Sequence, residues 1–232
     1  MRCRLVGSEM CIRDSFGSNF DDGFFFGGGL IATLKGFRGT PYKAKHSINF
    51  LYAPATNAFS LSYKLDRIGT FYRLNSDFIF EALFQDPVYT NFYGRGNKTV
   101  LNNELPKQYN FVRLDNYKIK IGTKKNWLNG RYIMRLGSFF ESTDVDEVPN
   151  RVSEDPTLMI STEDKSKINH LGAFYDLQIN TIVNEGARPV EGFKFNFEAY
   201  YFNQIKSKNH FSTINGSASY FVSFFKNCLL YT

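Results

Sequence analysis

The chain has 232 residues, a formal net charge of +6 and an aromatic content of 17%, made up of 25 Phe, 14 Tyr and one Trp. The positive surplus is small, is spread along the chain and forms no basic run with interleaved aromatics, so nothing here indicates nucleic-acid binding. No apolar run reaches the roughly 18 residues of a membrane-spanning helix, which excludes that class. Mean hydropathy is only −0.32 in spite of the many rings, so polar residues must alternate with them.

The two ends of the chain are set aside before the fold is considered. Residues 1–15 and 227–232 resemble translated sequencing-adapter read-through, so we treat both as artefact and interpret 16–226 as one domain. These ends contain all the cysteines: Cys3, Cys11 and Cys228. The remaining segment therefore offers no disulfide, thiol nucleophile or cysteine-ligated metal site. We expect the domain to be a piece of a longer protein, so the missing signal peptide carries no information about export.

Apolar and polar residues alternate in segment after segment, as they do in strands with one apolar and one polar face. From Phe193 to Tyr201 every odd position is apolar, while the even positions include Lys194, Asn196 and Glu198. In chain order, the alternation predicts nine strands at 23–35, 43–54, 57–67, 71–84, 107–122, 129–141, 168–181, 191–205 and 210–225. Most of them exceed the usual strand of about five or six residues and match the roughly 9–11 residues that cross a bilayer at a tilt.

The connections between these strands fall into two sets. One set, 36–42, 68–70, 123–128 and 182–190, is uniformly short. The other set contains the short turns 55–56 and 206–209 and also two long excursions, 85–106 and 142–167, the second of which is acidic. In an up-and-down barrel alternate connections face the same compartment, and outer-membrane barrels combine short periplasmic turns with longer extracellular loops. The second set is therefore predicted to lie outside the cell.

A soluble β-sandwich or a lipocalin-like barrel also alternates, with its apolar face inside. Strand length and the abundance of rings favour the membrane alternative, in which aromatic side chains near strand ends form interfacial girdles. The tyrosines expected in such girdles are Tyr42, Tyr52, Tyr72, Tyr109, Tyr132, Tyr200 and Tyr201. We predict an all-β fold: part of a transmembrane antiparallel up-and-down β-barrel.

No recognisable catalytic constellation occurs in the chain, so we predict that this segment is not an enzyme and binds no cofactor or metal. The three histidines, His46, His170 and His210, are too scattered to form a ligand set by spacing. Four carboxylates fall on polar strand faces: Asp77, Glu81, Asp176 and Glu198. We expect them to point into a polar lumen and to pair there with Arg73, Lys118 or Lys194.

Several turn regions carry a family likeness. Asp21–Leu30, Gly36–Pro41 and Asn184–Phe193 resemble barrel segments of the bacterial surface antigen family, the BamA-like superfamily of outer-membrane assembly factors. Asn91–Asn97 resembles a segment of family members whose barrel follows a calcineurin-like metallophosphoesterase domain. The motif residues are Asp21, Asp22, Gly23, Gly27, Gly28, Gly29, Gly94, Gly96, Asn97, Arg188, Pro189 and Gly192. Glycines 27–29 lie inside a predicted strand, where we expect them to permit bends or bulges.

The resemblance implies a 16-stranded barrel in the outer membrane of a Gram-negative bacterium, of which this chain holds about strands two to ten. It implies insertion or translocation of polypeptides, or service as a membrane platform. Its implied partners are outer-membrane lipid, client polypeptides and an upstream periplasmic or catalytic domain. Two alternatives stay open: the membrane anchor of a surface metallophosphoesterase, and a porin or solute channel.

Overall fold

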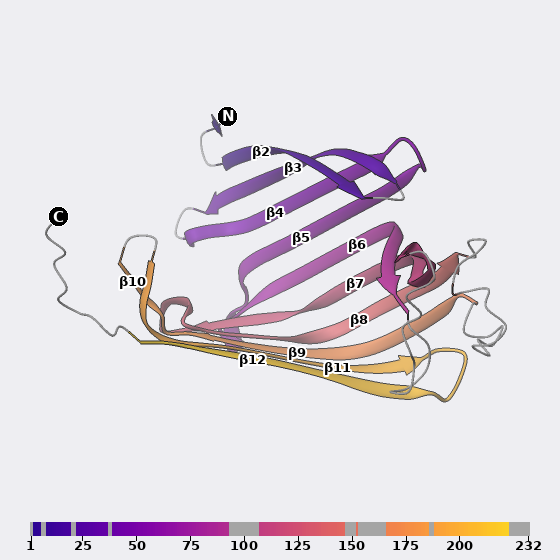
Figure 1. The fold of residues 1–232 in the computed structure, drawn as a ribbon. Helices are drawn as coiled ribbons and strands as arrows, with labels where there is room; N and C mark the ends of the chain where they lie inside the picture. The colour runs from indigo at the N-terminus through magenta and orange to yellow at the C-terminus, as the bar shows by residue number, and fades with distance from the viewer. Residues whose placement is uncertain are drawn as a thin grey trace, which may run out of the picture.

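The computed structural model describes residues 2–5, 8–19, 22–36, 39–92, 107–146, 152, 166–185 and 188–222. Nearly all of these residues lie in strands of one antiparallel sheet that curls without closing (Figure 1). Three short 3-10 turns interrupt it: η1 (Tyr72–Leu74), η2 (Lys107–Asn110) and η3 (Leu128–Gly130). Within the described ranges, no helix is long and apolar enough to cross a membrane.

Successive strands are neighbours in the sheet, which makes it an up-and-down meander. The strands are β1 (Arg2–Leu5), β2 (Ser8–Asn19), β3 (Gly23–Gly36), β4 (Gly39–Ala53), β5 (Ala58–Phe71), β6 (Ser76–Asn91), β7 (Phe111–Trp127), β8 (Tyr132–Asp146), β9 (Ile168–Asn180), β10 (Val183–Glu185), β11 (Arg188–Gln204) and β12 (His210–Phe221). The short β10 pairs with the start of β11, whose remaining length lies between β9 and β12. The open edges are therefore at opposite ends of the strand order: one is formed by β1 and the part of β2 that β1 leaves unpaired, and the other by β12 (Figure 1).

All nine predicted strands are present, and most are longer than the alternation indicated. β6 continues to Asn91 and β7 to Trp127, whereas the predicted ends were residues 84 and 122. The predicted turn at 68–70 is wrong: β5 runs through it, and the chain turns at η1, where Asn75 has a left-handed φ of 48°. Tertiary pairing extends strands past the point where the local alternation fades.

The structure also contains strands where none was predicted. β1 and most of β2 lie within residues 1–15, and β2 pairs with β3 from Ser8 to Asn19. The interpretation of those residues as read-through stays a prediction. The two predicted long excursions join β6 to β7 and β8 to β9. Because the strands alternate in direction, the strand ends that these connections join lie at the same end of the sheet as the turns that join β4 to β5 and β11 to β12.

The register separates the side chains into two faces, since residues paired across antiparallel strands point to the same side. One row runs Ile48, Tyr63, Ala82, Ile119, Phe140 and Leu171. The neighbouring row on the opposite face contains Ser47, Lys64, Glu81 and Lys120. The sheet thus has one apolar face and one charged face along most of its width.

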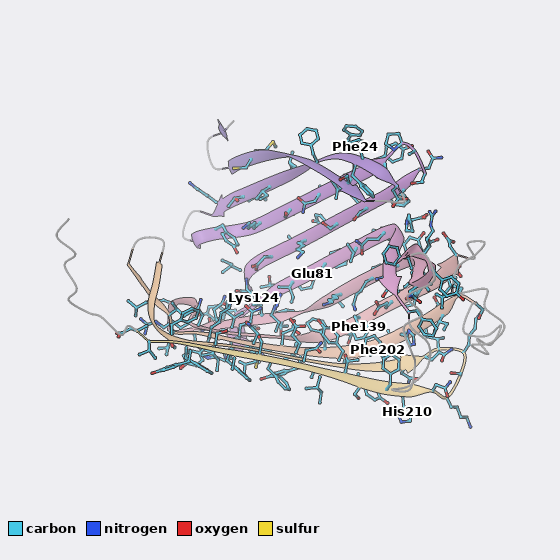
Figure 2. The ribbon with its side chains drawn as sticks, viewed as in Figure 1. Phe24, Glu81, Lys124, Phe139, Phe202 and His210 are labelled. Carbon is cyan, nitrogen blue, oxygen red and sulfur yellow. The ribbon has the colours of Figure 1, made fainter. Side chains whose placement is uncertain are left out.

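The charged face is the concave one. Lys120 Nζ on β7 donates a hydrogen bond of 2.8 Å to Tyr200 Oη on β11, although β8 and β9 lie between these strands. Three strand spacings amount to about 14 Å on a flat sheet, so the side chains meet because the sheet curls towards them. In Figure 2, Glu81, Lys124 and Phe139 lie on the side towards which the sheet curls, while Phe24 projects away from it.

Among the residues that the structure describes, a small hydrophobic core lies on the concave face. Ile79, Phe139 and Phe174 are buried there, with Tyr200 and Phe202 packed against them. A glycine makes room for the rings: a Cβ built on Gly172 would lie 2.6 Å from Cζ of Phe139. The convex face, in contrast, leaves large apolar side chains uncovered, with Ile121 at 49% and Leu136 at 48% exposure.

Candidate functional site on the concave face

A cation on β7 links two carboxylates on the concave face, near the strand ends at the η1 and η3 turns. Lys124 forms an ion pair with Asp66 of β5, and its Nζ also lies 3.8 Å from Oδ2 of Asp77 on β6. The hydroxyl of Tyr42 donates to Asp66 at 3.1 Å, and the Asn126 amide donates to Asp77 at 3.2 Å. Both carboxylates therefore gain polar partners from strands far apart in the sequence.

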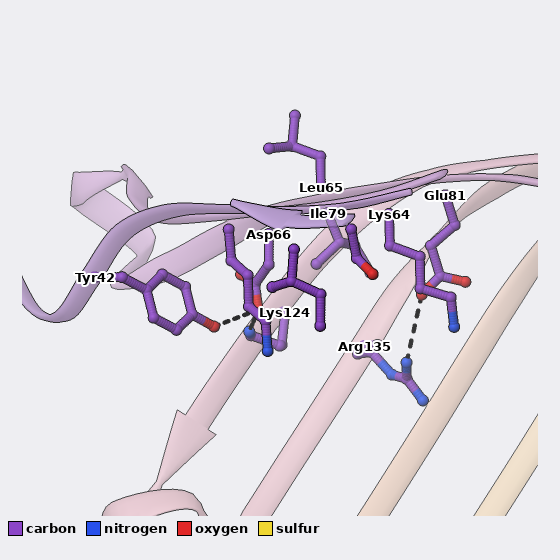
Figure 3. Close-up of a pocket in the computed structure, with 11 residues that line it drawn as sticks. Tyr42, Lys64, Leu65, Asp66, Ile79, Glu81, Lys124 and Arg135 are labelled. Atoms are coloured by element: carbon purple, nitrogen blue, oxygen red, sulfur yellow. Dashed lines mark hydrogen bonds and ion pairs between the residues drawn. The ribbon is translucent and has the colours of Figure 1, made fainter. Parts of the chain in front are cut away.

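A second shared cation lies on the next strand. Arg135 of β8 has Nη1 at 3.8 Å from Oε1 of Glu81 and Nε at 3.4 Å from Oδ2 of Asp176, whose side chain is only 5% exposed. Between these pairs the sheet is hollowed by about 280 Å³, with Tyr42, Lys64, Asp66, Glu81, Lys124 and Arg135 in its lining (Figure 3). Leu65, the neighbour of two of these residues, points to the other side of the sheet in the same view.

Aromatic rings fill the concave side from β8 to β12. Phe139 lies edge-on to Phe202 at 4.9 Å between centroids, and Phe202 stacks on Phe211 at 4.5 Å. Two lysines cover the rings, with Lys118 Nζ 5.0 Å from the Phe139 ring centre and Lys120 Nζ 4.8 Å from that of Tyr200. Such cation–π contacts hold charged groups over an otherwise apolar patch. This part of the concave face is occupied by the protein's own side chains.

The placement of the four predicted carboxylates on the polar face is confirmed, but the predicted partners are wrong for three of them. Asp77, Glu81, Asp176 and Glu198 all belong to rows of the concave face. The first three pair with Lys124 and Arg135, whereas Lys118 pairs with Glu141 at 2.9 Å. Partners two strands away become neighbours only when the register and the curl are known, so spacing along the chain could not identify them.

Two tyrosines expected in girdles lie elsewhere. Tyr42 and Tyr200 both direct their hydroxyls to the concave face, where they contact Asp66 and Lys120. Tyr52 near the end of β4 donates to Asn57 in the adjoining turn at 2.7 Å, and Tyr132 begins β8. The girdle prediction fails where a side-chain partner on the concave face is available.

The histidines do not converge. The ring of His46 lies 2.8 Å from the Tyr63 hydroxyl on the convex face, and His170 lies edge-on to Phe202 and Phe211 on the concave face. His210 begins β12. Among the residues that the structure describes, no group of His, Cys, Asp and Glu could hold a metal ion. The absence of enzymatic activity stays a prediction.

The N-terminal motif residues have structural contacts. Asp22 is fully buried and accepts a 2.6 Å hydrogen bond from Thr56, which ties the β2–β3 turn to the β4–β5 turn. Gly23 opens β3 with φ +70°, a conformation that favours glycine. The bulge expected at Gly27, Gly28 or Gly29 is not there: pairing with β2 and β4 is continuous across them, and the register shifts between Leu34 and Gly36.

The C-terminal motif lies at the β10–β11 hairpin. Arg188 and Pro189 are the first residues of β11. Gly192 has φ +131°, and a Cβ there would lie 2.6 Å from Cα of Ile182, so glycine is needed at this close approach. The Thr181 hydroxyl bridges the same place through 3.1 Å hydrogen bonds with the backbone of Phe193. Asp21, Gly94, Gly96 and Asn97 lie outside the described residues.

Comparison with family models, with curated proteins and with solved structures finds no match to this chain.

The sequence predicted the concave face only as a row of polar residues. Its aromatic cluster was missed because Phe139, Phe174 and Phe202 stand at positions that the alternation assigns to the polar face. The signal that could have shown it is a set of glycines on neighbouring strands of that face: Gly122 and Gly137 pair with each other, Gly137 pairs with Phe174, and Gly172 pairs with Phe139.

Proposed function

We propose that this chain forms wall strands of an outer-membrane β-barrel of the bacterial surface antigen family. We propose further that the complete protein inserts or translocates polypeptides or serves as a membrane platform. The observation that carries this proposal is the position of the two faces, which is the reverse of that in a soluble barrel. Ion pairs lie on the concave side, and exposed apolar side chains lie on the convex side. A soluble barrel buries its apolar face inside, whereas a transmembrane barrel presents it to lipid and keeps a polar interior.

The composition of the convex face supports this proposal. Three successive rows of the convex face, which pass through Tyr117, Ile119 and Ile121, contain no Asp, Glu, Lys or Arg from β4 to β9 among the described residues. Arg67 and Lys125 lie in the next two rows, towards the η1 and η3 turns. The three rows contain instead large apolar side chains such as Phe50, Phe80, Ile121, Phe140 and Leu171. A continuous exposed apolar surface of this extent would promote aggregation in water, and lipid removes that cost.

The height of the convex band also fits a bilayer. On β7, Tyr117 and Trp127 lie on the convex face, ten residues apart; Trp127 ends the strand and Tyr117 lies six residues after its start. At about 3.3 Å per residue and a tilt of about 40°, that separation corresponds to a height of about 25 Å, the apolar band of an outer-membrane barrel. Each ring has an aromatic neighbour: Phe84 lies 5.9 Å from Tyr117, and Tyr132 pairs with Trp127.

The choice among membrane functions rests on the turn-region resemblance and on the filled concave face. The aromatic cluster that includes Phe139 and Phe211, together with the lysines that cover it, lies on the concave side, which in a porin faces a water-filled channel. This favours the assembly or platform function over a solute channel. In planar bilayers the complete protein should show no steady open current, and a large constant conductance would favour the porin.

The membrane proposal is tested with two lysine substitutions on one strand and its turn. Ile121→Lys places a charge in the middle of the convex face of β7, where it should lower the free energy of unfolding of a membrane barrel by about 2–4 kcal/mol. Leu128→Lys in η3 places the same charge at the membrane interface, where the cost should be about 0–1 kcal/mol. Both side chains are exposed, at 49% and 67%, so a soluble protein would tolerate both. Urea unfolding in lipid–detergent micelles, followed by the fluorescence of Trp127, measures the difference. Equal stability of the two variants would overturn the proposal.

A further inference from the structure

A second hollow, of about 410 Å³, lies where β9, β11 and β12 meet the β11–β12 turn. Its apolar wall consists of Leu171, Tyr201 and Ile205, which are 55%, 47% and 58% exposed. Leu171, Tyr201 and His210 belong to convex rows of their strands. The hollow therefore opens on the face that we propose to contact lipid.

The rim of this hollow is basic. Lys208 and His210 line it together with the polar groups of Asn203 and Ser207, and none of its lining residues is acidic. Lys206 stands in the same five-residue turn and is exposed. In Figure 2, His210 projects from the β12 edge away from the concave face. A positive, hydrogen-bonding rim thus adjoins an apolar wall.

Backbone hydrogen bonds hold the turn against the sheet. The Gln204 amide donates to the Asn209 carbonyl at 3.0 Å, and the Ile205 amide donates to the Asn169 carbonyl at 2.9 Å. The Ser207 hydroxyl accepts from the Asn209 amide at 3.2 Å. The ammonium groups of Lys206 and Lys208 are therefore displayed from a defined turn next to the apolar wall.

We propose that this hollow binds the phosphate headgroup of an anionic lipid, with an acyl chain lying along Leu171 and Tyr201. Lysines at a membrane surface attract anionic headgroups, and long basic side chains extend along apolar surface while their charge stays in the wet interface. The proposal rests on the membrane function proposed above. It adds the chemical class of the lipid and the place where that lipid is held.

The experiment compares two spin-labelled lipids in mixed micelles that contain the refolded chain. The probes are phosphatidylglycerol, which is anionic, and phosphatidylcholine, which is zwitterionic, and the readout is the fraction of each that the protein immobilises. The wild-type chain should prefer phosphatidylglycerol, and Lys206→Gln with Lys208→Gln should lower that preference by about fivefold for each lysine at low salt. High salt should reduce the preference in the same way.

The matched control is Lys43→Gln with Lys125→Gln, which removes the same charge at the opposite end of the sheet and should leave the preference unchanged. Equal immobilisation of both lipids by the wild type would overturn the lipid site while leaving the membrane proposal intact. An equal loss of preference in the two double variants would have the same consequence. Immobilisation of neither lipid would instead refute the membrane proposal itself.

Discussion

Arg135 is the residue whose loss should cost the described fold most. Its guanidinium is shared between Glu81 on β6 and Asp176 on β9, so Arg135→Met leaves both carboxylates without their cation. The Asp176 side chain is 5% exposed, and removing one partner of such a buried pair costs about 3–5 kcal/mol. Glu81 is 28% exposed and recovers part of its solvation from water. We therefore expect a loss in the lower half of that range, about 3–4 kcal/mol.

The assay is urea unfolding of the refolded chain in micelles, with three comparisons. Arg131→Met removes an exposed arginine from the neighbouring turn and should change the free energy of unfolding by less than about 0.5 kcal/mol. The double variant Arg135→Met with Asp176→Asn should recover much of the loss, because no unpaired charge then remains at the buried position. If Arg135→Met is as stable as Arg131→Met, or if the second substitution recovers nothing, the argument from a shared buried cation is wrong.

Two further changes test the packing. Gly172→Ala should cost about 1–3 kcal/mol of stability, because its Cβ would meet the Tyr201 carbonyl oxygen and lie 2.6 Å from the Phe139 ring. Gly216→Ala on β12 has no atom within 4 Å of its Cβ and should be near neutral; thermal unfolding compares the two variants. Thr56→Val removes a hydrogen bond to the buried Asp22 carboxylate and should cost about 1–3 kcal/mol in the same measurement, while an unchanged midpoint would contradict a structural role for that bond.

The strand assignments came from local information and therefore needed no tertiary knowledge. Alternation with a period of two is written into each segment, so Phe193–Tyr201 could be assigned to a strand and divided into faces without its neighbours. The residues at which strands end could be predicted less well from the sequence. β7 continues to Trp127 through Lys124, Lys125 and Asn126, a polar run whose strand conformation depends on pairing with β8.

The contacts of the candidate site needed three-dimensional information. Lys124 and Asp66 are 58 positions apart, and Lys120 and Tyr200 are 80 positions apart; both pairs form only when register and curl bring their strands together. The bulge shows the same limit. Glycines 27–29 offered conformational freedom, but the register shift falls between Leu34 and Gly36, where β4 enters the sheet.

The sequence by itself determined that this is an antiparallel all-β chain whose strands have one apolar and one charged face, because both properties follow from residue order within each strand. It also placed the long connections at one end of the sheet. The tertiary structure alone decided which face is concave, and hence that the ion pairs lie inside the curve and the exposed apolar side chains of the convex rows lie outside it. The physical reason is that the curl of a sheet is a collective property of its pairing, to which Gly172 and the rings of Phe139 and Phe202 contribute from separate strands.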